Sequence, residues 1–144
     1  MTGRRQYRFL EHVTDALIES YGNSLEEAFE NAALGLMDTI LHLENVKGTS
    51  RYTFEVEGRD DKGLLYNWLE TVLIRVSTDL IAYASFKVRI YKTKDGVKIW
   101  ATALGETLDP TIHHPRTEVK SPTYHLMRIY KERDKVNIRF LLDL

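Results

Sequence analysis

The sequence contains no cysteine. This absence excludes a disulfide framework, a thiolate zinc site and a cysteine nucleophile together, and it fits a reducing compartment. No run reaches the roughly 18 apolar residues of a membrane span. The 20 basic and 21 acidic side chains give a formal net charge of -1, so no global positive field would hold a nucleic-acid backbone. We expect a cytoplasmic protein with no membrane contact, which meets RNA only indirectly or locally.

Familiar enzyme motifs are also missing. The chain has no glycine-rich phosphate loop, no GxSxG elbow, no HExxH and no paired CxxC. Adjacent histidines, His113 and His114, lie in a polar segment without helical spacing, where such pairs are more often solvated than bound to metal. The sequence therefore favours a protein that is not an enzyme.

Two helices are predicted. Ser24 and Glu27 form a capping box, and apolar side chains then recur at helical spacing, which predicts a helix near residues 24–41. Asp60 and Asp61 place negative charge before a second apolar stripe, which predicts a helix near 61–75. With 144 residues, 43% of them hydrophobic, we expect one domain over residues 1–144.

Most of the remaining chain alternates between apolar and polar residues, as strands do. Asp95-Gly96 separates two such runs and predicts a hairpin, and Pro122 predicts a bulge or a free edge in a later strand. Strands and helices do not alternate regularly, so we predict an α+β sandwich with two helices packed on a mainly antiparallel sheet. The predicted strands cover residues 7–12, 15–21, 51–56, 85–91, 97–105, 118–130 and 136–144.

Three carboxyl groups could bind a metal. Asp15 begins a predicted strand, Asp143 follows an apolar run in the last strand, and the main-chain carboxylate of Leu144 is one residue away. If gathered, they would form a hard oxygen site suited to calcium or magnesium. The alternatives are a turn-capping role for Asp15 and a solvent-facing Asp143. Spacing alone does not show that these groups meet.

A second group of polar residues lies on the strand predicted at 118–130. Glu118 and Lys120 share one face of it and Val119 the other, and His125 follows a few residues later. An exposed cross-strand ion pair and a functional surface explain this pattern equally well.

Several blocks of the sequence resemble one known family in order and spacing. The archease family opens with a His-Thr-Ala-Asp pattern, a Tyr-Gly turn and a Leu-Glu-Glu-Ala-Phe helix, and it ends in a strand of similar sequence. The matching blocks are residues 12–22 (HVTDALIESYG), 24–33 (SLEEAFENAA), 64–70 (LLYNWLE), the region from 105–106 (GE) through 118–120 (EVK) and 123–125 (TYH), and 142–144 (LDL). The resemblance covers nearly the whole chain.

Archeases are partners of RtcB-type RNA ligases, which use GTP and a divalent metal to join RNA ends in tRNA splicing. The resemblance implies a non-enzymatic activator that promotes guanylylation and turnover of the ligase. It places the family's metal site on Asp15, Asp143 and Leu144, with calcium as the expected ion. It also suggests that Glu118, Lys120 and His125 form the surface that acts on the ligase.

The chain departs from the family pattern in two places. Val76-Ser77-Thr78-Asp79 stands where relatives usually have His-Asp-Thr-Glu, and Val13-Thr14 replaces Thr-Ala in the opening motif. Two other functions remain open. One is a chaperone-like modulator of RNA-processing proteins, because the core resembles that of a chaperone family. The other is a small metal-dependent hydrolase with His125 as its base.

Overall fold

The computed structural model describes residues 6–10 and 15–144 of the chain. Its helices are α1 (Leu25–Ile40), α2 (Asp61–Ser77), the short α3 (Pro110–His113) and the 3-10 helix η1 (Leu43–Asn45). Its strands are β1 (Tyr7–Leu10), β2 (Asp15–Gly22), β3 (Ser50–Gly58), β4 (Ile81–Lys92), β5 (Val97–Thr107), β6 (Ser121–Glu132) and β7 (Lys135–Asp143).

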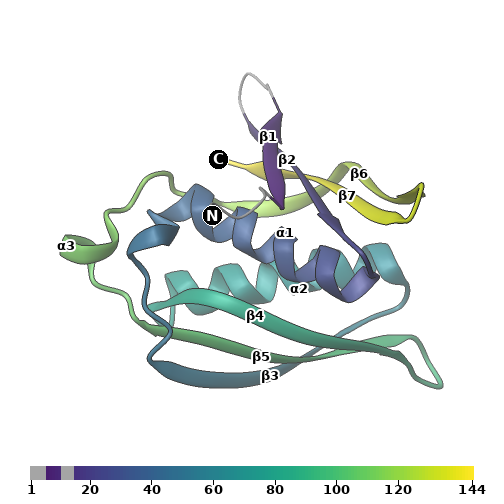
Figure 1. Cartoon of the computed structure of the whole chain (residues 1–144), viewed down its shortest axis with the longest axis horizontal. Helices are drawn as coiled ribbons and strands as arrows, with labels where there is room; N and C mark the ends of the chain where they lie inside the picture. Colours follow the sequence, from purple (N-terminus) through teal and green to yellow (C-terminus); the bar gives the residue numbers. More distant parts are fainter. Residues whose placement is uncertain (1–5, 11–14) are drawn as a thin grey trace.

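The strands form two antiparallel sheets with the long helices between them (Figure 1). One sheet has the order β1-β2-β7-β6 and the other β3-β5-β4. Helix α1 packs against β2 and β4, and α2 packs against β3 and β6, so each helix contacts both sheets. The predicted α+β class is confirmed. The strands divide between two sheets where the sequence suggested one, because alternation identifies the faces of a strand but not its partners.

Both long helices begin at the caps that the sequence predicts. The hydroxyl of Ser24 accepts a hydrogen bond from the amide of Glu27 (3.1 Å), whose carboxylate accepts from the amide of Asn23 (3.2 Å). At α2 the carboxylate of Asp60 accepts from the amide of Gly63 (2.8 Å). These bonds satisfy amides that the first helical turn leaves unpaired.

Within the described residues, no helix is long and apolar enough to cross a bilayer.

A buried tryptophan joins the two helices. Trp68 of α2 is fully buried, and its indole N–H donates to the main-chain oxygen of Phe29 in α1 (3.0 Å). The ring of Phe54, from β3, stacks on Trp68 with centroids 5.7 Å apart. One side chain therefore connects both helices and the three-stranded sheet.

Helix α1 also protects an edge of the three-stranded sheet. Strand β4 lies at this edge, and its Val88 amide donates to the carboxylate of Glu30 (2.8 Å), while the Ile90 amide donates more weakly to Glu26 (3.5 Å). Burial raises the pKa of Glu30, although the bond from Val88 opposes this shift. Capping edge amides in this way prevents another strand from pairing there.

The tryptophan contact leads to a stability prediction. Trp68→Phe removes a buried hydrogen bond and leaves unfilled space, so the free energy of unfolding should fall by about 2 kcal/mol. The matched control is Trp100→Phe, because Trp100 is 44% exposed and should change stability by less than about 0.5 kcal/mol. Urea unfolding followed by far-UV circular dichroism measures both. Equal losses in the two variants would contradict the role given to Trp68.

Candidate metal and partner-binding site

The structure places two of the predicted metal ligands opposite each other. Strands β2 and β7 pair antiparallel along their whole length, and Asp15 is the direct partner of Asp143. Directly opposed residues project from the same face of a sheet, with Cβ atoms about 4.5–5.5 Å apart. Asp143 is exposed and Asp15 is half-buried. Two residues from distant parts of the sequence thus present their carboxylates at one corner of the four-stranded sheet. We call this pair of residues the aspartate corner.

Leu144 follows directly at this corner. Its side chain is half-buried and packs against the hydrophobic core, which holds the main chain next to Asp143 in place. Among the described residues, no three side chains of His, Cys, Asp or Glu are grouped closely enough to hold a metal. A cation here would therefore need main-chain oxygens and water in addition to the two aspartates. Oxygen donors of this kind suit calcium, which tolerates irregular shells.

The predicted ligase-facing residues lie on the segment that leads into β6. Glu118 and Lys120 are exposed and Val119 between them is buried, as the alternation predicted, but the strand begins only at Ser121. The amide of Lys120 donates to the main-chain oxygen of Asp143 (2.8 Å). The backbone of Lys120 is therefore fixed beside the aspartate corner.

His125 lies farther along β6, in a large bulge. Thr123 is opposite Leu141 and Arg128 is opposite Arg139, so residues 124–127 face a single residue of β7. The His125 side chain is exposed, and its amide donates to the hydroxyl of Thr123 (2.8 Å). Strand β6 is also an edge strand, so both consequences expected from Pro122 are observed.

A buried glutamate on the same sheet face was not predicted. Glu19 is 3% exposed and accepts hydrogen bonds from Arg8 (2.7 Å), Tyr21 (2.9 Å) and Arg139 (2.8 Å). Burial raises its pKa, but these bonds outweigh burial, so the pKa of Glu19 lies below its ordinary value. Burial and the Glu19 carboxylate together raise the pKa of Tyr21 to about 12. This cluster ties β1, β2 and β7 together.

The histidine pair also differs from expectation. His114 is exposed, but His113 is fully buried, so the prediction that both are solvated is wrong for His113. Its Nδ1 accepts from the amide of Asp109 (2.9 Å), which leaves Nε2 to donate to the carboxylate of Glu106 (2.8 Å). Hydrogen bonds from the Lys47 amide and from His113 lower the pKa of Glu106. The pair fastens the α3 segment to the end of β5.

The variant family motif lies at the end of α2. Val76 is buried, Ser77 ends the helix and Thr78 is its C-cap. Asp79 is exposed in the turn that leads to β4. The other variant positions, Val13 and Thr14, lie outside the described residues, as does His12.

These features define a small α+β protein, with two helices between antiparallel sheets and an aspartate corner where its first and last long strands meet. A profile of the "Archease protein family (MTH1598/TM1083)" matches residues 7–144. The chain is 43% identical to "Protein archease" of Pyrococcus abyssi over 130 residues, which are 90% of this chain and 92% of that protein. The corresponding protein of Methanothermobacter thermautotrophicus is 36% identical over 138 residues, 96% and 98% of the two chains.

A solved structure agrees with this relationship. The solution structure of Methanobacterium thermoautotrophicum protein 1598 superposes on this chain with a TM-score of 0.86 and 35% sequence identity. The superposition covers 98% of this chain and 100% of that protein's chain. The chain belongs to the archease family.

The glutamate cluster predicts how stability depends on pH. The pKa of Glu19 is lowered by folding from its ordinary value of 4.5, so its stabilising effect is fully present above pH 4.5 and is lost as the pH falls below it. Glu19→Gln should weaken this dependence and reduce stability at neutral pH by about 1.5–3 kcal/mol. The control is Glu57→Gln, because that side chain is 75% exposed. Urea unfolding at several pH values tests this, and an unchanged acid dependence in Glu19→Gln would refute it.

Proposed function

We propose that this protein is a non-enzymatic, calcium-binding accessory protein that activates an RtcB-type RNA ligase during tRNA splicing in the cytoplasm. The observation that carries the proposal is the pairing of Asp15 with Asp143 at an exposed corner, with the backbone of Lys120 bonded beside it. Membership of the archease family supports the choice of partner.

The metal would bind at the aspartate corner. Two carboxylates held on one sheet face repel each other, and a cation between them removes that repulsion. Asp15, Asp143 and a main-chain oxygen of Leu144 are the proposed ligands, and water would complete the shell. Calcium supplies positive charge and accepts the irregular arrangement of oxygen atoms that this corner offers. The corner is accessible, because Asp143 is exposed.

The ligase would contact the segment beside this corner. Glu118 and Lys120 project to solvent, while the buried Val119 anchors the backbone between them. His125 extends the surface along β6. Exposed charges on an anchored backbone can act on a partner while contributing little to the stability of their own fold.

Lys120 tests the partner surface. Lys120→Ala should reduce GTP-dependent guanylylation of the ligase roughly tenfold, as expected when a charge at a partner surface is lost. Its melting temperature should remain nearly unchanged, because the side chain is exposed. Lys94→Ala is the matched control, since Lys94 is exposed in the β4–β5 turn and should keep full activation. Full activation by Lys120→Ala, or a large loss of its stability, would reverse this reading.

Calcium binding is tested by thermal unfolding. A ligand held only by the native state contributes about 2.7 kcal/mol at a hundred times its dissociation constant, which corresponds to a rise in Tm of roughly 5–10 °C. Asp15→Ala and Asp143→Ala should abolish the rise. Asp134→Ala, an exposed aspartate of the β6–β7 turn, should retain it. The same rise in all variants would show that calcium binds elsewhere.

A further inference from the structure

The three-stranded sheet has one face turned away from the helices. Helices α1 and α2 cover its inner face, and β3, β4 and β5 form the outer layer of the molecule (Figure 1). Along the central strand β5, Trp100 and Leu104 are exposed, whereas Ile99 and Ala101 are buried. The outward residues of β5 therefore form the middle of a solvent-facing surface, which we call the outer face.

Two aromatic side chains lie close together on the outer face. Trp100 is 44% exposed and Tyr91 of β4 is 43% exposed. Arg89 is the direct partner of Trp100, and Tyr91 is the direct partner of Lys98. Tyr91 and Trp100 are therefore diagonal neighbours on adjacent strands, with Cα atoms about 7–8 Å apart. In the described part of the chain, no ring or cation is stacked on either of them. Their ring faces are available to a ligand.

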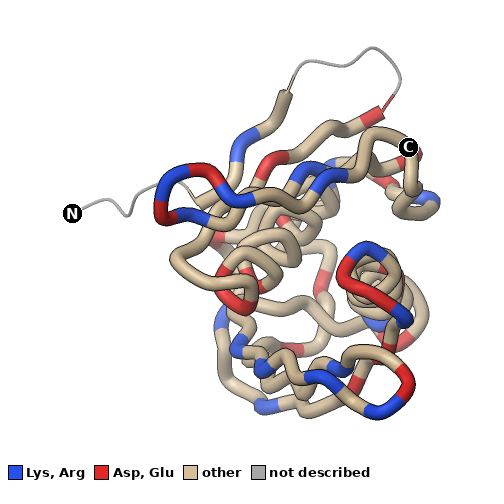
Figure 2. Tube along the Cα trace, turned by 90° about the vertical axis from the view of Figure 1, so that its right-hand side faces the viewer, with Lys and Arg blue, Asp and Glu red and all other residues tan. Residues whose placement is uncertain are grey.

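Charges of both signs lie beside these rings. Arg89 and Glu55 are the two direct cross-strand partners of Trp100, and the Tyr91 hydroxyl donates to the Glu55 carboxylate (3.5 Å). The carboxylates of the outer face include Glu55 and Glu57, and its cations are Arg51, Lys87, Arg89 and Lys98. The Nζ of Lys98 lies 3.8 Å from Oε1 of Glu57. Among the residues that the structure describes, Arg51, Lys87 and Arg89 form no ion pair. Figure 2 shows blue positions recurring along these strands at the bottom of the molecule.

A hollow lies beside these aromatic residues at the β4 edge of the sheet, between the outer face and helix α1. The hollow has a volume of about 590 Å³ and is lined by Trp100, Tyr91, Arg89, Ile90 and Glu26. It brings two aromatic rings, a guanidinium group and a carboxylate acceptor to one place. These groups match the parts of a nucleotide: a base that stacks and accepts or donates hydrogen bonds, and a phosphate that needs a cation.

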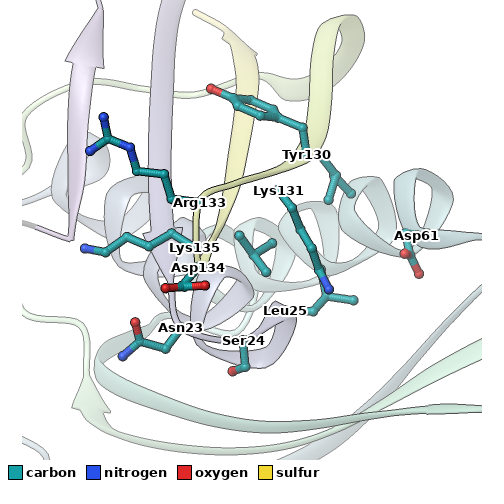
Figure 3. A pocket seen from close by; sticks show the side chains of 11 residues that line it. Asn23, Ser24, Leu25, Asp61, Tyr130, Lys131, Arg133, Asp134 and Lys135 are labelled. Carbon is teal, nitrogen blue, oxygen red and sulfur yellow. The ribbon is translucent and has the colours of Figure 1, made fainter.

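Two other basic parts of the described surface lack this combination. On the four-stranded sheet, Arg8 and Arg139 are already bonded to Glu19. A second hollow, at the β6–β7 turn, is lined by Lys131, Arg133 and Lys135, but Figure 3 shows these side chains pointing in different directions. The ring of the nearby Tyr130 is covered by Arg128, 4.4 Å from its centroid.

We propose that the outer face binds single-stranded RNA, with bases stacked on Trp100 and Tyr91 and phosphates held by Arg89, Lys87 and Arg51. Aromatic platforms beside cations bind single strands because every base has a stacking face, whereas a duplex hides its bases. The choice of RNA over other single strands rests on the proposed role beside an RNA ligase. The binding itself does not need the ligase. With a formal net charge of -1, the chain should bind weakly and with strong salt dependence.

The test is fluorescence anisotropy with a labelled single-stranded RNA of about 12 nucleotides, measured on the full chain without ligase. Trp100→Ala should raise the Kd about 5- to 100-fold. Arg89→Ala should raise the Kd and reduce the salt slope by about 1. Arg133→Ala is the charge-matched control and should leave the Kd unchanged. Circular dichroism checks folding, and Trp100→Thr replaces Trp100→Ala if the latter does not fold.

Three outcomes would overturn the proposal. One is an unchanged Kd in Trp100→Ala, and another is equal binding of the same sequence as a duplex. The third is that polyglutamate binds with the same dependence on Trp100, which would make an acidic protein surface the occupant. Guanylylation of the ligase, measured without RNA, tests the proposed function separately. Either proposal can therefore fail while the other stands.

Discussion

The pairing of β2 with β7 is the constraint on which the candidate site depends. It joins strands from opposite ends of the sequence, and the bond between Arg139 and Glu19 spans 120 positions. In this register Asp15 faces Asp143, and β6 pairs with the other side of β7. A slip by one residue would turn Glu19 toward the helices and Ile18 toward solvent. The buried Glu19 cluster and the core on the other face therefore fix the same alignment that creates the aspartate corner.

Much of the fold could be predicted because its signals are local. The caps at Ser24 and Asp60 set the start of each helix, and the Asp95-Gly96 turn sets the β4–β5 hairpin. The division into two sheets depends on contacts between distant strands, which alternation does not contain. Pro122 predicted a bulge or a free edge in β6. The length of the bulge could not be predicted, because it depends on how Thr123 and Arg128 pair with β7. The short α3 has too few residues to show a helical period.

The candidate site was predictable in its residues but not in its geometry. Carboxylates at the ends of strands singled out Asp15 and Asp143, while only the register shows that they are direct partners. Glu19 was missed because its partners Arg8 and Arg139 lie on other strands. The burial of His113 was not predicted, because nothing in the local sequence distinguishes it from its neighbour His114. The structure buries His113 and exposes His114. Burial of a polar residue depends on tertiary partners that no local pattern reveals.

The two proposed surfaces lie on different sheets, so contact with a ligase at the aspartate corner would leave the outer face with Trp100 open to RNA. We propose above that this protein allows a ligase to act repeatedly. The most direct measurement is the number of RNA ends joined per ligase molecule, with the ligase limiting and RNA ends in excess. We expect many joined ends per ligase when this protein is present and about one when it is absent. The same yield in both reactions would contradict it.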